Sequence, residues 1–382
     1  MSSKYYRSTI MEVDLERIEH NLNEYKRVVP NKQMIAVIKA NGYGLGSTVL
    51  AEFLSEKGID FFAVATLDEA IELRMHGIRD KILVLGAIIP KDINKAIQHR
   101  IAVTAPSLNW VKQAKAKVKD KYEKEVWIHI KVNNGFNRQG TNDVGELKQM
   151  VEEIKNFKYF KYEGLYSHFS SANEDNDKTS VEYERFKGII QALEHPPYVH
   201  IQNTAGALTI DASVCNAMRI GIGLFGYYPS EFIHQSTDIK LRAAVQLKTK
   251  VLDEQFLDEN DVVGYGQTYS AKSKEKIVIL PIGYADGFTR QMTGYKMIIN
   301  DSECEVVGNV CMDMTMVRVP DNVKIGDEVT IVSKEDMHIN SLYNYAKHME
   351  SITYEALCLI SKRVPRKYIY GDSQFVNNDV LK

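Results

Sequence analysis

Residues 61–70 read FFAVATLDEA, and this segment shows the strand–helix alternation that runs through the first half of the chain. The apolar run 61–65 has the length and composition of a buried strand. Thr66 follows it, with Glu69 three residues later, which is the capping-box spacing that begins a helix. The helix is expected to end near Gly77, because glycine often follows a helix C-terminus. A buried strand that leads directly into a capped helix is typical of a parallel sheet covered by helices.

The same pattern recurs on both sides of this unit. Further short apolar runs are predicted as strands at 34–38, 82–85, 101–104, 126–132, 164–168, 198–202 and 217–221. Helical patterns lie between them, for example at 144–155 and 180–193. Repeated strand–helix units predict a parallel sheet, and about eight of them would close a (β/α)8 barrel of ~250 residues. An open doubly wound sheet is the competing geometry, because periodicity alone does not distinguish the two.

The pattern changes near residue 241. Short strands with Gly, Asp and Asn turns between them are predicted at 245–252, 276–280, 296–299, 304–310 and 329–332, with short helices near 339–348 and 354–362. This arrangement is typical of a mostly antiparallel β domain. We therefore expect an α/β protein in which an N-terminal (β/α)8 TIM barrel at 1–240 is followed by a C-terminal β domain at 241–382.

The composition is that of an ordinary globular protein. The 382 residues are 44% hydrophobic and include 48 basic and 50 acidic side chains. The formal net charge of -2 gives no electrostatic reason to expect nucleic acid or a membrane as the main partner. The N-terminal segment has no apolar core typical of a signal peptide, and no run approaches the roughly 18 apolar residues of a membrane helix. The four cysteines have no metal-ligand spacing, so we expect reduced thiols, no metal site and a cytoplasmic location.

Lys39 is the first candidate for chemistry. It ends the apolar run 34–38 and is followed by the glycine-rich segment ANGYGLG. A lysine at the end of a barrel strand would stand at the C-terminal mouth, where barrel active sites are found. A partly desolvated lysine there can form a Schiff base, although on position alone a solvated lysine after an edge strand is the more common arrangement. The glycines match neither G-x-G-x-x-G nor the Walker pattern, which disfavours a nucleotide-binding oxidoreductase.

Loops in the second half carry further candidates. Arg219 begins an RIGIG motif whose glycines at a strand end could cradle a phosphate, although an arginine in an interdomain turn is equally frequent. Tyr265 in VGYGQTY and Tyr284 in PIGYADG lie in glycine-bracketed loops that suit proton transfer or recognition. Taken singly, His168 and Met312 are more often a satisfied strand-end histidine and a core methionine. These signals become specific only in combination.

In combination, the motifs closely resemble the alanine racemases. The resemblance is carried by VIKANGYGLG, LYSHFSSANE, QNTAG, MRIGIGLFGYYP, VVGYGQTYSA, PIGYADGF, GNVCMDM and ITYEALCLISKRVPR, and it covers nearly the whole chain. It implies an enzyme that uses pyridoxal 5'-phosphate to interconvert L- and D-alanine and so supplies D-alanine for peptidoglycan. It also implies a head-to-tail homodimer in which each active site combines a barrel mouth with β-domain loops of the partner subunit.

The resemblance also assigns roles to individual positions. Lys39 matches the lysine that carries the cofactor, and Tyr265 matches the second catalytic base, which acts in the site of the other subunit. Arg219 matches the arginine that faces the pyridine nitrogen, and His168 matches the histidine that supports it. The phosphate-binding positions correspond to Tyr43, Thr204, Gly221, Ile222 and Tyr354. The other matches are Arg138 and Met312 near the substrate carboxylate, with Lys131, Tyr284 and Asp313 along the entry route or around the site.

These roles imply a two-base reaction. Inversion at Cα removes a proton from one face and returns one to the other, so two bases are needed, here Lys39 and Tyr265. A free tyrosine has a pKa near 10 and requires positive charge around it, part of which Arg219 and His168 would supply. Because arginine does not readily exchange a proton with the ring, the pyridine nitrogen would stay unprotonated. The ring would then be a weaker electron sink, which favours return of the proton over transamination.

One segment departs from the family pattern. Residues 131–140 read KVNNGFNRQG, where the usual form is KVDTGMGRLG. Lys131 matches a lysine that is often carbamylated and then orients the arginine at position 138. With four substitutions between residues 133 and 137, an unmodified lysine or a bound chloride is an alternative to the carbamate.

Three other functions stay open. A serine or broad-specificity racemase is supported only by the altered loop at 133–137. A decarboxylase of basic amino acids on the same cofactor would release carbon dioxide and would not need Tyr265 as a base. A non-catalytic carrier would hold the aldehyde through Lys39 and would not need the β domain.

Overall fold

The computed structural model describes residues 5–119, 124–335 and 338–381 and contains two compact units. The barrel unit consists of Asn21–Gly42 and Gly46–Leu241. The sheet unit consists of the described residues of Met1–His20, Tyr43–Leu45 and Arg242–Lys382. The predicted domains 1–240 and 241–382 stay a prediction, since compactness does not test whether either segment folds independently.

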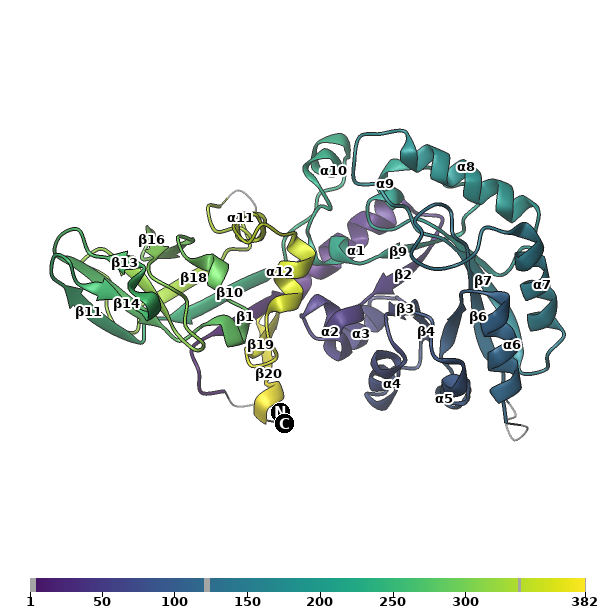
Figure 1. Ribbon diagram of the computed structural model, residues 1–382, viewed down its shortest axis with the longest axis horizontal. Helices are drawn as coiled ribbons and strands as arrows, with labels where there is room; N and C mark the ends of the chain where they lie inside the picture. The colour runs from purple at the N-terminus through teal and green to yellow at the C-terminus, as the bar shows by residue number, and fades with distance from the viewer. Residues whose placement is uncertain (1–4, 120–123, 336–337, 382) are drawn as a thin grey trace. The chain divides into compact units, whose positions relative to one another are not determined.

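Eight parallel strands close into a barrel in the order β2-β3-β4-β5-β6-β7-β8-β9 (Figure 1). The strands are β2 (Gln33–Val37), β3 (Phe61–Val64), β4 (Lys81–Val84), β5 (Ala102–Ala105), β6 (Val126–Lys131), β7 (Phe160–Tyr166), β8 (Tyr198–His200) and β9 (Ala217–Ile220). Closure is made by parallel pairing of β9 with β2, which aligns Ile35 with Arg219. The predicted barrel is therefore confirmed, and the open sheet is excluded.

Helices follow the strands and lie on the outer side of the barrel (Figure 1). They are α3 (Ser47–Glu56), α4 (Leu67–Met75), α5 (Ile93–His99), α6 (Leu108–Lys117), α7 (Val144–Lys155) and α8 (Lys178–Gln191), with short helices α2 (Lys39–Tyr43), α9 (Gly206–Thr209) and α10 (Glu231–Ser236). The predicted capping box is present at α4, where the Glu69 N–H donates to Thr66 Oγ1 and the Thr66 N–H donates to the Glu69 carboxylate. The helix α1 (Leu15–Val28) precedes β2.

The sheet unit is built on ten strands in the order β11-β14-β17-β16-β15-β18-β10-β1-β19-β20. Their bounds are β1 (Ile10–Asp14), β10 (Val245–Lys250), β11 (Asp253–Leu257), β14 (Glu275–Leu280), β15 (Lys296–Ile299), β16 (Ser302–Val306), β17 (Thr315–Val319), β18 (Glu328–Val332), β19 (Arg366–Tyr370) and β20 (Ser373–Asn377). A separate pair joins β12 (Val262–Val263) to β13 (Tyr269–Ser270). Helices α11 (Leu342–His348) and α12 (Thr353–Leu359) complete the unit.

Pairing in this sheet is antiparallel except between β1 and β19, which confirms the predicted mostly antiparallel domain. The strand β1 comes from the N-terminus, yet it pairs with β10 and β19. Among the described residues, no helix has the length and apolar character required to cross a bilayer.

Candidate active site

Lys39 follows β2 directly and is half-buried at the carboxyl end of a barrel strand, as expected. The chain then turns through three residues with left-handed backbone angles, Ala40 at φ 52°, Asn41 at φ 55° and Gly42 at φ 63°. Asparagine and glycine tolerate this region better than other residues. Glu69 holds the turn, because its carboxylate accepts the N–H of Ala40 at 2.7 Å.

Arg219 lies near the carboxyl end of β9 and is 3% exposed. Its Nη1 donates to His200 Nδ1 at 2.6 Å, and its Nη2 donates to the Ser167 carbonyl at 2.8 Å and to His168 Nδ1 at 3.0 Å. Weaker contacts at 3.2–3.3 Å reach two further backbone carbonyls. Burial lowers the pKa of Arg219 to about 10, so the guanidinium stays charged at neutral pH. These partners are all neutral acceptors, and all use the terminal nitrogens.

His168 is neutral in this setting. Burial comes first among the causes that lower its pKa well below the ordinary value, followed by the positive charges of Arg219 and Lys131. Arginine donates only, so His168 Nδ1 must be the acceptor and the ring proton is on Nε2. The expectation that His168 supplies positive charge is therefore not supported, and the positive field comes from Arg219.

Lys131 lies at the end of β6 and is buried, with its Nζ 4.6 Å from the centre of the Tyr166 ring. Burial, and then the charges of Arg219 and Arg138, lower its pKa well below the ordinary value. Within the described parts of the chain, no ion pair joins Lys131 to a carboxylate. The amine therefore lies in a site that disfavours positive charge and is suited to modification or to an adjacent anion.

The altered loop after β6 surrounds Arg138 with a different set of side chains from the family pattern. The Arg138 guanidinium lies over the Phe136 ring at 4.3 Å, and the same ring packs edge-on against His168 at 5.5 Å. Asn134 is fully buried and accepts a hydrogen bond from Ser167 Oγ at 2.7 Å. The Nδ2 of Asn134 has no hydrogen-bond partner among the described residues.

The predicted phosphate-binding residues are divided between the two units. In the barrel unit, the Gly221 N–H donates to Thr204 Oγ1 at 3.1 Å, and a 3-10 turn begins at Ile222. In the sheet unit, the rings of Tyr43 and Tyr354 are 6.1 Å apart. Burial raises the pKa of both phenols, so both keep their protons and can donate to an anion.

The sheet unit carries the remaining predicted residues on neighbouring loops. Tyr265 is 76% exposed, and its carbonyl accepts a hydrogen bond from Asn309 Nδ2 at 2.7 Å. The N–H of Tyr284 donates to the Cys311 carbonyl at 3.0 Å. Gly283 permits this packing, because a Cβ there would lie 2.3 Å from the Cys311 carbonyl oxygen. Met312 is also exposed, and Asp313 accepts a hydrogen bond from Arg363 at 2.8 Å.

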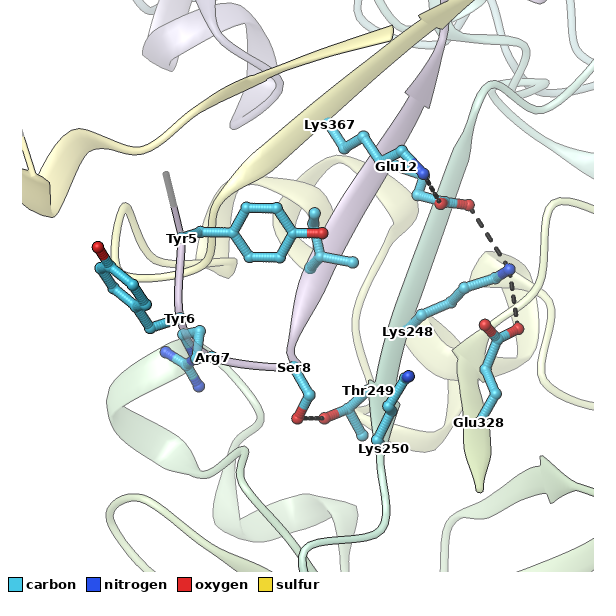
Figure 2. Close-up of a pocket in the computed structure, with 11 residues that line it drawn as sticks. Tyr5, Tyr6, Arg7, Ser8, Glu12, Lys248, Thr249, Lys250, Glu328 and Lys367 are labelled. Atoms are coloured by element: carbon cyan, nitrogen blue, oxygen red, sulfur yellow. Dashed lines mark hydrogen bonds and ion pairs between the residues drawn. The ribbon is translucent and has the colours of Figure 1, made fainter. Parts of the chain in front are cut away.

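The sheet unit also has a concave region (Figure 2). This cavity of about 430 Å³ is lined by β1, β10 and the segment before β1. Glu12 joins Lys367 at 3.2 Å and Lys248 at 3.6 Å, and Lys248 continues to Glu328 at 2.9 Å (Figure 2). No predicted site residue lines this cavity, and its charges are largely paired with one another.

Sequence reasoning missed several buried polar side chains beneath Arg219. His129 on β6, Glu163 on β7 and His200 on β8 are all buried inside the barrel unit. The sequence did contain a signal for these residues, because each of the three polar side chains interrupts an apolar strand. Burying a charged or imidazole side chain there is unfavourable unless the side chain is hydrogen-bonded. Glu69 was recognised only as a helix cap, although it also holds the backbone after Lys39.

Comparisons with known proteins agree along the whole chain. Residues 13–229 match the family model described as alanine racemase, N-terminal domain, and residues 244–368 match alanine racemase, C-terminal domain. The chain is 46% identical to an alanine racemase of Macrococcus caseolyticus over 382 residues, with 100% of each chain covered. It is 45% identical to that of Staphylococcus carnosus over 370 residues, with 96% of each covered.

Solved structures are also similar over nearly the whole chain. The alanine racemase from Bacillus anthracis with bound L-Ala-P superposes with a TM-score of 0.95 at 33% identity and 99% coverage of both chains. A histidine racemase from Leuconostoc mesenteroides superposes with a TM-score of 0.88 at 26% identity, covering 97% of this chain and 100% of its own.

Proposed function

The chain belongs to the alanine racemase family of amino-acid isomerases, and we propose that it racemises alanine with pyridoxal 5'-phosphate through Lys39 and Tyr265. The observation that carries the proposal is the buried guanidinium of Arg219. Its contacts to neutral acceptors use Nη1 and Nη2, and among the described residues Nε has no hydrogen bond, so Nε would be available to a ligand. A pyridine nitrogen with a free lone pair is a suitable acceptor for such a donor.

The donor set of the chain suits this cofactor. Lys39 would offer the amine for the aldehyde, and Arg219 would face the ring nitrogen. The phosphate would be held by Tyr43, Thr204, Gly221, Ile222 and Tyr354, which offer hydroxyl and backbone N–H donors. When bound, the cofactor withdraws electrons from the amino acid and acidifies its Cα proton.

Two residues then transfer the Cα proton, one on each face of the substrate. Lys39 holds or releases the Cα proton on one face, and Tyr265 of the partner subunit does so on the other. The exposure of Tyr265, at 76%, is consistent with a side chain that acts outside its own unit. Arg219 keeps its own proton and donates a hydrogen bond without protonating the ring. The neutral His168 supports Arg219 from the side as an acceptor.

Substrate selection is proposed to rest on Arg138 and Met312, which would contact the carboxylate and close the pocket, with Tyr284 and Asp313 along the entry route. The Phe136 ring below Arg138 restricts the guanidinium. Lys131 would orient Arg138 either as a carbamate or through a bound chloride. A histidine racemase shares this fold, so the fold alone does not select alanine, and a serine or broad-specificity racemase is the second candidate because of the altered 133–137 loop.

The biological setting follows from the same proposal. We propose a homodimer with shared active sites, in which the barrel domain at 1–240 binds the cofactor and the β domain at 241–382 supplies Tyr265 to the other subunit. The enzyme would act in the cytoplasm, where it would supply D-alanine for the synthesis of peptidoglycan. All four cysteines are free thiols, which suits a reducing compartment.

The test combines absorbance with racemisation of L-alanine by the purified protein. We expect a yellow protein whose imine band is bleached by borohydride. Lys39→Ala should lose both the band and the activity, whereas Tyr265→Phe should keep the band and lose most of the activity, with one direction of proton exchange affected more. Normal racemisation by Tyr265→Phe would refute the two-base assignment. Relative turnover of D-alanine, D-serine and D-lysine decides the substrate.

A further inference from the structure

We propose that Glu163 is a positioning residue for Arg219, acting through a buried relay formed by His129 and His200. The relay deepens the proposed function, because its catalytic consequence depends on Arg219 facing the cofactor. Its hydrogen-bond order is a property of the barrel unit alone and can be measured separately.

The relay is a continuous series of hydrogen bonds inside the barrel. Arg219 Nη1 contacts His200 Nδ1 at 2.6 Å, and His200 Nε2 contacts His129 Nδ1 at 3.1 Å. His129 Nε2 then contacts Glu163 Oε2 at 3.2 Å. Both histidines are fully buried, so neither ring contacts bulk solvent.

Arginine chemistry gives the relay one direction. The guanidinium can only donate, so His200 Nδ1 must accept and its ring proton must be on Nε2. His200 Nε2–H therefore donates to His129 Nδ1, which places the proton of His129 on Nε2 as well. That proton is donated to the Glu163 carboxylate, which is an acceptor when ionised. The order Arg219 to His200 to His129 to Glu163 satisfies every buried donor, and the reverse order would place two N–H groups against each other at Arg219.

Charge supports the same assignment. Burial lowers the pKa of His200 well below its ordinary value, and the neighbouring charge of Arg219 lowers it further. For His129, burial also outweighs the nearby Glu163 and lowers the pKa. Burial acts to raise the pKa of Glu163, but the hydrogen bond from His129 and the charge of Lys81 lower it below its ordinary value. The relay thus connects a cation to an anion through two neutral imidazoles.

The backbone is adapted to make room for this arrangement. The pairing of β6 with β7 shifts register between Ile128 and His129, which face Tyr162 and Gly164 respectively. Glu163 is therefore the extra residue of a bulge, a device that re-aims a side chain. A Cβ at Gly164 would lie 2.0 Å from His129 Nδ1, so the imidazole fits only beside a glycine.

The far end of the relay is anchored where the barrel strands begin. Lys81, the first residue of β4, donates to Glu163 Oε1 at 3.1 Å and to the Tyr198 hydroxyl at 2.8 Å. Its side chain is 41% exposed, so it connects the relay to the surface at the end of the barrel opposite the mouth. Because Arg219 fixes the proton order whatever role Glu163 has, substitution of Glu163 is needed to test its effect on Arg219.

The first test measures the proton order directly. The holoenzyme labelled with 15N-histidine is studied by NMR from about pH 6 to 9, a range that spans the ordinary histidine pKa near 6.5. We expect His129 and His200 to stay neutral with the proton on Nε2 throughout. A proton on Nδ1 of His200, or a charged imidazolium at either residue, would overturn the relay whatever the activity.

The second test removes the charge of the anchor. Glu163→Gln can still accept from His129 through its amide oxygen, while Lys81 turns toward solvent. We expect a changed 15N shift at His200 and a decrease of about tenfold in kcat with little change in KM, because the relay keeps its hydrogen bonds but loses the anion at its far end. Glu153→Gln is the matched control, because Glu153 also pairs with a lysine, Lys115 at 2.8 Å, but between two outer helices.

The outcomes separate this inference from the proposed function. An unchanged His200 signal together with unchanged kcat in Glu163→Gln would show that Glu163 does not act on Arg219. The expected proton order in a protein that does not racemise any amino acid would instead refute the function and leave the relay intact. Should Glu163→Gln fail to fold, a different proton order in the unsubstituted protein would still overturn the inference.

Discussion

Gly164→Ala places a methyl group where the His129 imidazole lies. The new Cβ would be 2.0 Å from Nδ1, 2.4 Å from Cε1 and 2.6 Å from Cγ of that ring. The ring cannot yield easily, because it is fully buried and packs face to face with Tyr198 at 6.3 Å and edge-on with Phe61 at 6.0 Å. The conflict is steric, since Gly164 lies in a strand and does not adopt a left-handed backbone.

The loss of stability caused by Gly164→Ala has two parts. Overpacking a core costs about 1–3 kcal/mol, and each buried polar group that loses its partner costs about 1–3 kcal/mol more. Displacement of His129 affects its hydrogen bonds to both His200 and Glu163. We therefore expect destabilisation of about 3–9 kcal/mol, and a decrease in Tm of at least about 6 °C for a unit of this size.

Scanning calorimetry measures this change in the presence and absence of pyridoxal 5'-phosphate, because a bound ligand shifts apparent stability. Gly188→Ala is the control, since it lies within α8 and a Cβ there meets no atom within 4 Å. That variant should be stabilised by about 0.5–1 kcal/mol, as is usual for alanine in place of a helical glycine. A Gly164→Ala protein as stable as the unsubstituted chain would refute the placement of His129 and the bulge beside it.

Two further predictions concern the altered loop and its lysine. In buffer containing 13C-bicarbonate, we expect a carbamate NMR signal that Lys131→Met abolishes. The lowered pKa of Lys131 favours the unprotonated, nucleophilic amine, and the charges of Arg138 and Arg219 favour the resulting anion. The absence of that signal would favour the unmodified lysine or bound chloride. Phe136→Leu removes the ring beneath Arg138, and because a cation–π contact contributes about 0.5–1 kcal/mol, we expect KM for alanine to rise about two- to fivefold with kcat nearly unchanged. An unchanged KM would indicate that Phe136 does not restrict Arg138.

The local parts of the barrel could be predicted closely from the sequence. The helix predicted at 144–155 is α7 (Val144–Lys155), and the strand predicted at 126–132 is β6 (Val126–Lys131). These elements have strong periodicity and clear caps, such as Asp143 at the start of α7. The strand β1 was not predicted, because its pairing with β10 and β19 joins segments more than 200 residues apart. Long-range pairing leaves no signal in a short window of sequence.

For the candidate site as well, some features could be predicted from the sequence and others could not. Lys39 could be placed at a strand end because the apolar run 34–38 precedes it, whereas Arg219 was a candidate only because of the glycines that follow it. The relay beneath Arg219 could not be derived, because it depends on the register of β6 against β7 and on a bulge that only the paired strands define. The roles of the individual site residues stay predictions that the variants above test.

The buried imidazoles also predict how stability depends on pH. Burial and neighbouring cations lower the pKa of His168 and His200 well below their ordinary value, so both are neutral in the folded barrel. In the unfolded chain each would bind a proton with a pKa near 6.5. The unfolded state therefore binds more protons below that pH, and stability must decrease as the pH falls through about 6.5.

The magnitude follows from this difference in proton binding. At about pH 5.5, one pH unit below the unfolded pKa, each of the two histidines removes about 1.4 kcal/mol relative to pH 8. His129, whose pKa is also lowered, acts in the same direction. The lowered pKa of Glu163 affects the free energy of unfolding only in more acidic solution. Its contribution to stability is lost at pH values below the ordinary carboxyl pKa range. Urea unfolding at pH 8 and at pH 5.5 should therefore show that the free energy of unfolding decreases by about 3 kcal/mol or more at the lower pH. His168→Gln should reduce this decrease by the contribution of one histidine, about 1.4 kcal/mol. A free energy of unfolding that stays constant over this range would mean that these rings are charged in the folded state, which the hydrogen bonds from Arg219 to both of them do not allow.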